Sequence, residues 1–404
     1  MKYDVVIVGA GPAGSTAAKF LAEKGINVLL IDKSKFPRDK SCGGGLPVRA
    51  LRQFPYLENS DLIESYSYGG IAYYSTSSDR AELHRKDPIL AMVRREKFDY
   101  GLVKLAIKSG ATFLNEKSAK DVRLSEKNVT LILEDGSKIE TEIIIGADGV
   151  WSTLARKAGL CPNKRPTSMC VFQEYPMDST MIDRYFSEKR LCYIFLRFQD
   201  VVGYAWVFPK KSHVNIGIDE VRLPGADPQY KINLKEVYIQ FIDVLRQQKV
   251  LPEDFKIGKV RGAALPIFPL DKTYADRLLM CGDAGGFINP ITGEGLYYAM
   301  ASGKLAAEVC IQAFEARDTS SRFLSRYETM WKQEFGDDLK LLLRIHKRWN
   351  RDVKKYFQLA ASDRMLSEMI LDVATGQIGA RECRWKLLRR FLYVYLKNLI
   401  RKKK

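Results

Sequence analysis

The chain of 404 residues lacks several features that would place it in common functional classes. It has no apolar run of about 18 residues, which argues against a membrane-spanning helix. Its seven cysteines are scattered and form no CxxC pair, and it has only three histidines. We therefore expect no metal site, no iron–sulfur cluster and no disulfide framework. The N-terminus opens directly into an expected strand, Tyr3–Val8, without the basic and apolar segments of a secretion signal, so we expect a cytoplasmic protein.

Acidic residues are scarce in the last part of the chain. The segment Lys340–Lys404 holds 18 Lys and Arg but five Asp and Glu, so it carries +13 of the formal net charge of +17. Apolar residues recur there at three- and four-residue steps between basic ones, a pattern typical of a helix lying on an anionic membrane. The apolar positions are Leu388, Phe391, Leu392, Tyr395 and Leu399, and the basic ones are Arg384, Arg389, Arg390, Lys397 and the final residues 401–404. A helix docked on the protein with a solvated basic face fits equally well. No nucleic-acid partner is expected, because no motif that reads nucleic acid is present.

The order of expected elements indicates an α/β fold with two joined domains. Strands and helices alternate in the first third, as in a doubly wound parallel sheet with insertions. The expected elements are strands Tyr3–Val8, Asn27–Ile31, Thr112–Leu114, Val129–Leu133, Ile143–Ala147 and Leu278–Cys281, and helices Ala13–Lys24, Glu96–Lys108 and Gly293–Ala316. Further strands between Met169 and Ile218 indicate an antiparallel sheet. We predict a Rossmann-type domain over residues 1–165 and 260–316, an inserted antiparallel-sheet domain over 166–259, and a C-terminal helical region with the basic tail over 317–404.

A glycine fingerprint lies between the first strand and the first helix. Gly9, Gly11 and Gly14 form a GxGxxG pattern, and Asp32 ends the next strand 18 residues after Gly14. Glycines let the backbone approach a pyrophosphate at the helix N-terminus, and an acid at this distance binds ribose hydroxyls. The pattern predicts a dinucleotide site. No second GxGxxG occurs, so the chain offers a nicotinamide cofactor no recognisable domain of its own.

Three further segments carry a family resemblance. They are Arg95–Asp99 at a helix start, Gly146–Ser152 after a buried strand, and Cys281–Leu296, which contains CGDAG and NPITGEGL. Together with the fingerprint they resemble the FAD-dependent proteins that include aromatic hydroxylases, flavin halogenases and geranylgeranyl reductases. The resemblance covers roughly residues 1–310 and implies non-covalent FAD as the cofactor. The residues it implies at FAD are Gly9, Gly11, Ala13, Gly14, Asp32, Lys33, Cys42, Gly43, Gly44, Arg95, Ala119, Asp148, Asp283, Gly295 and Leu296.

The implied roles follow from charge and backbone geometry. Arg95 would neutralise a phosphate, and Asp283 would bind the ribityl or pyrophosphate part of FAD. The turn before Leu296 would aim a helix N-terminus at the flavin edge that becomes negative on reduction. Arg95 as a surface residue at a helix start, and Asp148 as a turn aspartate, are the alternatives.

Two motifs point within this group to the geranylgeranyl reductases. Tyr204–Pro209 resembles their YxWxFP motif, and Ser41–Leu46 resembles their cysteine–glycine loop beside the flavin ring. The GxG that often follows YxWxFP in that family reads Gly217-Ile218-Asp219 here. Alternation along a strand places Tyr204, Trp206 and Phe208 on one face, which is the pattern of a core strand or of a wall for a polyprenyl chain. The resemblance favours the wall, with these three residues contacting substrate and with Cys42, Tyr204 and Trp206 as catalytic candidates. Cys42 as a small residue in a tight loop is the alternative.

The resemblance implies a reductase that saturates the double bonds of geranylgeranyl chains, most typically on archaeal ether lipids or their precursors. An isoprenoid lipid is therefore the expected substrate, and the basic tail suits a phosphate head group or a peripheral membrane contact. The expected reductant is NAD(P)H or an electron-donor protein such as ferredoxin. A monooxygenase or halogenase of the same fold, which would activate oxygen at the flavin, is the alternative.

Overall fold

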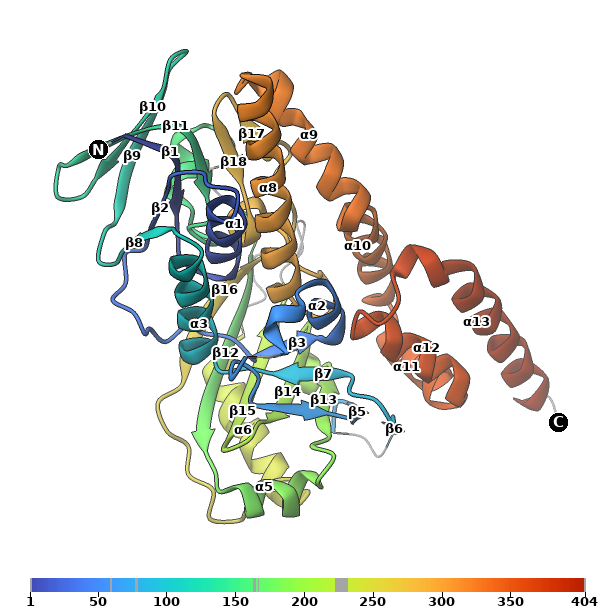
Figure 1. Cartoon of the computed structure of the whole chain (residues 1–404). Coiled ribbons are helices and arrows are strands. Elements are labelled where there is room, and N and C mark those ends of the chain that lie inside the picture. Colours follow the sequence, from blue (N-terminus) through green and yellow to red (C-terminus); the bar gives the residue numbers. More distant parts are fainter. Residues whose placement is uncertain are drawn as a thin grey trace. The chain divides into compact units, whose positions relative to one another are not determined.

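The computed structural model describes residues 2–58, 60–76, 79–162, 165, 167–221 and 232–402, without the side chains of residues 2, 401 and 402. The chain forms two compact units. The first comprises Met1–Lys40, Arg95–Thr167 and Leu265–Leu339, and the second comprises Ser41–Arg94, Ser168–Ala264 and Lys340–Lys404. Figure 1 shows the elements of both units along the chain.

The first unit is built on a mostly parallel sheet. Strands β18, β11, β1, β2 and β8 run parallel in that order, β17 pairs antiparallel with β18, and β10 joins β9 to β11. The side chains of the central strands are apolar and buried on both faces of the sheet, as expected for a parallel sheet covered by helices. The strands are β1 (Lys2–Val8), β2 (Val28–Ile31), β8 (Thr112–Leu114), β9 (Ala119–Leu124), β10 (Val129–Leu133), β11 (Lys138–Gly146), β17 (Tyr274–Ala275) and β18 (Leu278–Met280).

Helices of the first unit pack closely through small residues. A Cβ placed on Gly303 of α8 would lie 2.2 Å from the carbonyl oxygen of Ala13 in α1, so glycine is required where these helices meet. The helices are α1 (Pro12–Ala22), α3 (Arg95–Lys108), α4 (Thr153–Lys157), α7 (Gly282–Gly285), α8 (Leu296–Ala316) and α9 (Ser321–Trp331), followed by the π-helical turn η3 (Lys332–Gly336). Ala13 also packs on Gly282, so the N-terminus of α1 lies beside α7, which contains Asp283.

The second unit is built on a seven-stranded sheet in the order β16-β12-β15-β14-β13-β5-β6. From β12 to β6, neighbouring strands run antiparallel except β13 and β5, which pair in parallel. The strands are β5 (Gly69–Tyr74), β6 (Arg80–His84), β12 (Thr167–Pro176), β13 (Cys192–Leu196), β14 (Tyr204–Pro209), β15 (His213–Glu220) and β16 (Arg261–Pro266). A small sheet is formed by β3 (Gly45–Pro47), β7 (Leu90–Met92) and β4 (Ser65–Ser67).

The side chains of strand β14 alternate between the two faces of the seven-stranded sheet. Ala205 and Val207 point into a large apolar core that also holds Phe195, Ile216 and Phe241. The opposite face carries Tyr204, Trp206 and Phe208. The shorter elements of this unit are α2 (Val48–Gln53), η1 (Pro55–Leu57), α5 (Ser179–Phe186), η2 (Phe198–Asp200) and α6 (Leu234–Gln247).

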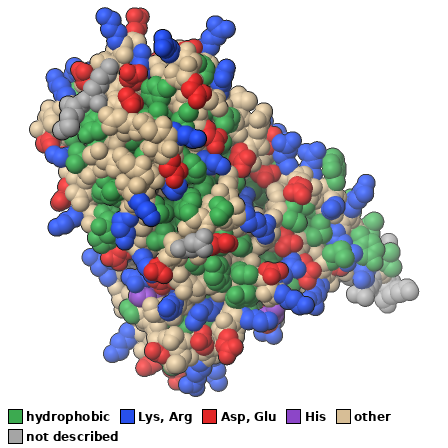
Figure 2. All heavy atoms as spheres, viewed as in Figure 1, with side chains coloured by type: hydrophobic (Ala, Val, Ile, Leu, Met, Phe, Trp, Pro, Cys, Tyr) green, Lys and Arg blue, Asp and Glu red, His purple; other side chains and the backbone are tan. Residues whose placement is uncertain are grey.

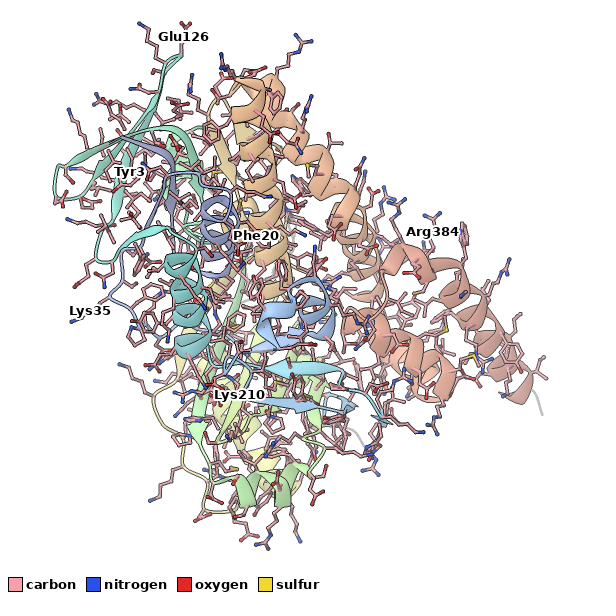
Figure 3. The ribbon with its side chains drawn as sticks, in the orientation of Figure 1. Tyr3, Phe20, Lys35, Glu126, Lys210 and Arg384 are labelled. Carbon is pink, nitrogen blue, oxygen red and sulfur yellow. The ribbon has the colours of Figure 1, made fainter. Side chains whose placement is uncertain are left out.

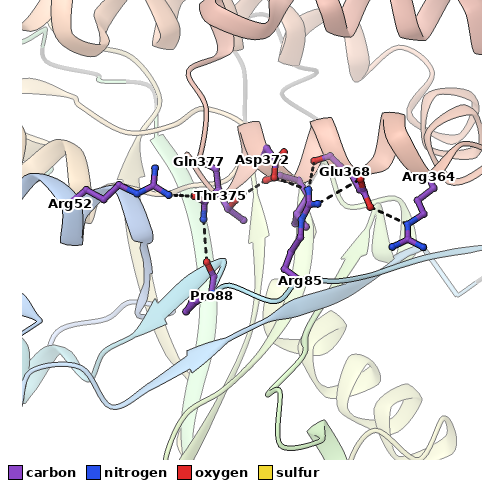
Figure 4. Close-up of polar contacts among 9 residues, drawn as sticks. Arg52, Arg85, Pro88, Arg364, Glu368, Asp372, Thr375 and Gln377 are labelled. Atoms are coloured by element: carbon purple, nitrogen blue, oxygen red, sulfur yellow. Dashed lines mark hydrogen bonds and ion pairs between the residues drawn. The ribbon is translucent and has the colours of Figure 1, made fainter.

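The end of the chain is helical, with α10 (Asp337–Trp349), α11 (Val353–Ala361), α12 (Arg364–Ala374) and α13 (Ala380–Lys402). Figure 4 shows how α12 is tied to the rest of the second unit: Arg85 binds Asp372 at 2.8 Å and Glu368 at 3.6 Å, and Arg52 donates to Gln377 at 2.7 Å. None of the described helices is long and apolar enough to cross a bilayer. The contacts of Arg85 and Arg52 thus anchor the C-terminal helices to the second unit.

The predicted α/β class is confirmed, and the observed elements lie within a few residues of the expected ones. The compact units divide the chain differently from the predicted domains, in that residues 41–94 group with the second sheet and 317–339 with the first. The reason is the pairing of β5 with β13 and of β6 with β5, which joins segments more than a hundred residues apart. The predicted antiparallel sheet also contains one parallel pair, β13 and β5.

Candidate FAD site and aromatic face

The three glycines of the fingerprint have different physical roles. Gly9 has φ +103°, and a Cβ on it would lie 2.2 Å from the carbonyl oxygen of Ala147. A Cβ on Gly14 would lie 1.9 Å from the carbonyl oxygen of Gly9. The fold itself requires both. Gly11, the N-cap of α1, has φ −73°, and its Cβ would meet only the Arg38 guanidinium at 3.7 Å. Gly11 therefore leaves open space at the uncapped N-terminus of α1, where a pyrophosphate fits.

Asp32 is held at the end of β2, as the fingerprint predicts. Its carboxylate accepts hydrogen bonds from the backbone N–H groups of Ala10 and Ser34, both at 2.8 Å. The side chain is nearly buried. These bonds fix the carboxylate beside the glycine turn and leave lone pairs for ribose hydroxyls. Lys33, the next residue, is exposed, and its contact with FAD stays a prediction.

A pair of arginines lies next to this turn around one buried acid. Arg95 binds Asp99 in a bidentate manner at 2.7 and 2.8 Å, and Arg38 reaches the same carboxylate at 3.0 Å. Arg38 also lies 4.0 Å from Asp32. Two guanidinium groups share one fully buried carboxylate, and the Arg38 guanidinium lies beside Gly11. Sequence reasoning selected Arg95 and missed Arg38, because nothing in the motif marks the segment after β2.

Asp283 and the start of α8 face the same region of the first unit. Asp283 lies in the first turn of α7, and among the described residues no donor hydrogen-bonds to its carboxylate. Its Oδ1 lies 3.6 Å from the position of a Cβ on Gly295, the N-cap of α8. Gly282, beside Asp283, packs on Ala13, because a Cβ on Gly282 would lie 3.0 Å from the Ala13 Cβ. The turn before α8 is rigid, because Asn289 accepts from the N–H groups of Ile291 and Thr292.

Asp148 and Ala119 have surroundings that the motifs did not reveal. The Asp148 carboxylate accepts from Ser152 Oγ, the N-cap of α4, at 2.5 Å and from the first-turn N–H groups of Thr153 at 2.7 Å and Leu154 at 3.2 Å. Burial raises its pKa, while these bonds act in the opposite direction. This is the turn role considered above as the alternative. Ala119 begins β9, the second strand after α3. The FAD contacts of both residues stay predictions.

The donor set of the first unit suits FAD. It combines open space over Gly11, uncapped N–H groups of α1, two arginines on one acid, and an Asp283 carboxylate without a hydrogen-bond partner in the described chain. The region thus offers positive groups for a pyrophosphate and acids for ribose and ribityl hydroxyls. All predicted FAD residues outside the Cys42 loop belong to this one unit.

In the second unit, the Cys42 loop is fixed by a buried polar network. Asn215 donates to the carbonyl oxygen of Cys42 at 3.1 Å and to Glu174 at 2.7 Å. Glu174 also pairs with Lys210 at 2.8 Å. Lys210 is 1 % exposed and lies among the strands of the sheet, where Figure 3 labels it. Because Lys210 is buried and Glu174 is only partly exposed, this ion pair holds both charges in one geometry.

The glycines of the loop are needed for close packing on this network. A Cβ on Gly44, which has φ +79°, would lie 2.2 Å from the carbonyl oxygen of Val93. A Cβ on Gly43 would lie 3.1 Å from the Phe208 ring. Cys42 Sγ accepts from the Gly44 N–H at 3.4 Å. The structure therefore brings the Cys42 loop and the aromatic strand together.

The aromatic residues of β14 form one continuous surface, here called the aromatic face. Ring centroids are 5.8 Å apart for Tyr204 and Trp206 and 6.2 Å apart for Trp206 and Phe208. Trp206 donates to Asn215 Oδ1 at 2.8 Å, and its ring covers Gly217, where a Cβ would lie 2.2 Å from the ring. The Trp206 ring therefore explains why position 217, the first of the Gly217–Asp219 stretch, is glycine. Neighbours on this face are Cys170, Phe172, Ile194 and Ala263.

Sequence reasoning missed Glu174, Lys210 and Asn215. One signal was available, because Asn215 shares the alternation of Gly217 on β15 and therefore its face. The pairing of Asn215 with Phe208 and with Glu174 depends on strand register, which a single sequence does not specify.

Comparisons with known proteins agree with this geometry. A family model described as FAD binding domain matches residues 2–329. Digeranylgeranylglycerophospholipid reductase 1 of Methanopyrus kandleri is 31% identical over 379 residues, covering 92% of this chain and 97% of the relative. The digeranylgeranylglycerophospholipid reductase of Methanocaldococcus jannaschii is 32% identical over 355 residues, covering 85% and 86% of the two chains.

Solved structures show the same fold. A geranylgeranyl bacteriochlorophyll reductase-like protein of Thermoplasma acidophilum matches with a TM-score of 0.76 and 24% identity, over 98% of this chain and 96% of that one. The flavin-dependent brominase Bmp2 matches with a TM-score of 0.73 and 21% identity over the whole of both chains. Because reductase-like and halogenating proteins share the fold, the fold does not choose between the two reactions.

Proposed function

Because this chain belongs to the family of FAD-dependent digeranylgeranylglycerophospholipid reductases, we propose that it saturates the double bonds of geranylgeranyl chains on archaeal-type membrane ether lipids or their precursors. The observation that carries the proposal within this chain is the aromatic face of Tyr204, Trp206 and Phe208, packed against the Cys42 loop. When bound, reduced FAD would supply the hydride for each double bond, and a proton from an acid group or water would complete the saturation. The remaining roles fall to residues of the chain.

The aromatic face suits an isoprenoid chain. Phe172, Ile194 and Ala263 extend the ring surface of β14, so the face offers apolar contact without charged side chains at its centre. Burial of each chain methylene on such a surface contributes about 0.8 kcal/mol. Trp206 is held by Asn215 and backed by Gly217, so the wall is rigid before the chain binds. A rigid wall positions a double bond and excludes water from it.

The Cys42 loop is held on the same network, and we propose that its main task is positioning. Its carbonyl oxygen is bound by Asn215, and its thiol accepts a backbone N–H within the loop. Both contacts order the loop beside Phe208. We also propose that the Cys42 thiol or the Tyr204 side chain takes part in catalysis. Measurements of the reaction itself have to test this part of the proposal.

The proposal is tested with the FAD-loaded protein, reduced chemically and mixed without oxygen with a digeranylgeranyl glycerophospholipid. Mass spectrometry is expected to show products that gain two hydrogens per reduced double bond. Geranylgeranyl diphosphate and free geranylgeraniol serve as comparison substrates, since they share the chain and differ in the head group. Products that appear only with oxygen and carry a hydroxyl or a halogen would replace the reductase by a monooxygenase or halogenase.

The second part of the proposal concerns contact with a membrane through α13. The inner side of α13 packs on α11 and α12 through Leu387, Phe391, Val394 and Tyr395. The predicted stripe was therefore wrong for Phe391 and Tyr395, which face protein. Arg390 is also engaged, since it binds Asp363 at 2.6 and 2.8 Å. The basic side chains of residues 401–404 lie outside the described part of the chain.

The outer side of α13 remains apolar and uncovered. Figure 2 shows hydrophobic side chains gathered on this helix among Lys and Arg. Trp385 and Ile400 are each 62 % exposed, and the exposed apolar residues between them are Leu388, Leu392, Tyr393, Leu396 and Leu399. A groove lined by Met365, Met369, Ile378, Lys386 and Arg389 continues this surface onto α12. A large apolar patch rimmed by cations suits an anionic lipid surface.

Replacing Leu388 and Leu392 by aspartate is expected to reduce sedimentation with anionic vesicles strongly and to reduce the weak binding to neutral vesicles less. The change removes two apolar side chains that would be buried in the membrane and adds two negative charges that the anionic lipids repel. For comparison, each basic group near such a surface contributes about 1 kcal/mol of attraction. The matched control is Ile107→Asp, an equally exposed residue on α3. The membrane contact is ruled out if the intact protein does not sediment with anionic vesicles at low salt.

A further inference from the structure

A groove lies between α12 and α13 at the end of the second unit. It has a volume of about 590 Å³, and most of its lining is apolar. Met365 and Met369 are four residues apart, so they share one side of α12, and Ile378 joins them from the segment between the two helices. Sites for small molecules commonly have volumes of about 300–1,000 Å³. The groove is therefore large enough for one hydrocarbon chain.

The groove lies on the side of α13 next to its exposed leucines. Lys386, Arg389 and Tyr393 line the groove and follow one another at steps of three and four residues, so they share one side of the helix. Leu388 and Leu392 each stand one position earlier, which places them on the neighbouring side. A third side packs on α11 and α12. The groove and the outer apolar surface can therefore be altered separately.

Ion pairs hold both walls of the groove in place. On α12, Asp372 binds Arg85 at 2.8 Å, as Figure 4 shows. On α13, Arg390 binds Asp363 at 2.6 and 2.8 Å. Each of these pairs joins a lining residue to another element, so the groove is formed before anything binds in it. A preformed site loses less conformational freedom when its ligand binds.

Two cations of the groove have no acidic partner. Lys386 and Arg389 are exposed, and within the described part of the chain neither forms an ion pair. The lining acids are Asp372, which is paired, and Glu382, so the unpaired cations outnumber the unpaired acid. Lysine and arginine lay their stems along apolar surface and keep their charged ends in water. Both charged ends can therefore meet one phosphate at the mouth of the groove.

We propose that the groove binds one anionic lipid molecule, with its hydrocarbon chain against Met365 and Met369 and its phosphate at Lys386 and Arg389. The inference rests on the proposed membrane contact, which brings lipid to α13. Methionine side chains adapt to ligands of different shape, so the groove accepts chains that differ in branching. Burial of the chain provides affinity, and the two cations select a charged head group. The groove thus retains a lipid molecule beside the helix that contacts the membrane.

Charge favours a lipid over a second copy of the chain in this groove. In a symmetric dimer each surface meets itself, so the unpaired cations of the two copies would face one another. An anionic lipid instead supplies the opposite charge. The distribution of charge therefore selects the lipid as the occupant.

The experiment uses the FAD-loaded protein labelled with carbon-13 at its methionine methyl groups. The chain has ten methionines, and Met365→Leu and Met369→Leu identify the two signals from the groove. The probe is palmitoyl lysophosphatidate below its critical micelle concentration, so that single lipid molecules are added. Both groove signals are expected to shift and to saturate at one lipid per groove. The inference is refuted if neither signal shifts, or if neutral monopalmitoylglycerol binds equally well.

Variants that remove charge test the role of the two cations. Lys386→Gln is expected to weaken lysophosphatidate binding about fivefold, and the double change with Arg389→Gln roughly thirtyfold, as for cationic groups near an anionic surface. The matched control combines Arg351→Gln and Lys354→Gln, two exposed cations three residues apart around the start of α11. It loses the same charge away from the groove and is expected to bind as the wild type does. Equal weakening in both double variants would overturn the inference.

Further outcomes distinguish the possible failures. Groove signals that change with protein concentration in the absence of lipid would show that a second copy covers the groove, which contradicts the inference. The probe is monomeric, so the measurement needs no membrane. Shifted groove signals in a protein that does not sediment with vesicles would refute the membrane contact alone, and shifted signals in a protein that reduces no lipid would refute the reductase alone. Sedimentation with unshifted groove signals would refute the groove alone.

Discussion

Replacing Gly11 by glutamate is expected to give a folded, colourless protein. Gly11 is the one glycine of the fingerprint that the fold does not require, since its φ of −73° suits any residue and a Cβ there meets only Arg38 at 3.7 Å. A glutamate at this position would place its carboxylate over the N-terminus of α1 and beside Arg38. It would occupy the pyrophosphate position and repel the phosphates. The visible absorbance of the purified protein and its melting temperature measure the two effects separately.

Matched variants of the same turn test this explanation. Gly11→Ala adds only a methyl group in open space and is expected to keep most of its FAD. Gly14→Ala places a Cβ 1.9 Å from the carbonyl oxygen of Gly9 and is expected to impair folding itself. Asp283→Ala is expected to bind FAD more weakly and to remain folded. Full retention of FAD in both Gly11→Glu and Asp283→Ala would contradict the assignment of the site.

Replacing Trp206 by alanine is expected to change which partly saturated lipids are formed, or to slow their formation, without loss of FAD. Trp206 is 5 % exposed, donates to Asn215 and covers Gly217. Removing the ring leaves a cavity in the aromatic face and leaves Asn215 without its donor. Substitutions of this size commonly lower the free energy of unfolding by about 3–5 kcal/mol, so the variant is assayed well below its melting temperature.

Val207→Ala is the matched control for Trp206→Ala. Val207 is the next residue of β14 and is fully buried, but it belongs to the core on the other side of the sheet. It is expected to lose about 0.5–3 kcal/mol of stability and to keep the wild-type product ladder. If Trp206→Ala also keeps the wild-type ladder and rate, the aromatic face is core packing and does not contact substrate.

The local parts of the FAD site could be predicted from sequence, because their determinants are adjacent in the chain. A strand, a glycine turn and a helix N-terminus follow one another at Gly9–Gly14, and Asp32 ends the next strand. The alternation of Tyr204, Trp206 and Phe208 likewise predicted a shared face, which the ring distances confirm. In each case the structure depends on neighbouring residues or on the period of one strand.

The features that sequence reasoning missed depend on contacts between distant segments. Arg38 joins the site through Asp99 on α3, about sixty residues later in the chain. Asn215 connects the Cys42 loop to Glu174 only because β12, β15 and β14 pair in one particular register. The stripe on α13 shows the same limit, since helical periodicity grouped Phe391 with Leu392 although only Leu392 faces outward. Helical periodicity shows which residues share one side of a helix, but it does not say whether protein or solvent covers that side.

The central claim is that this protein transfers reducing equivalents from its flavin to a geranylgeranyl chain. The most direct measurement mixes the reduced, FAD-loaded protein without oxygen with a geranylgeranyl lipid and follows the return of the oxidised flavin absorbance. The same lipid with fully saturated chains is the control, because it fits the same surface and has no double bond to reduce. The account predicts rapid reoxidation by the unsaturated lipid and none by the saturated one. Reduced flavin that persists with both lipids and is oxidised only by oxygen would contradict it.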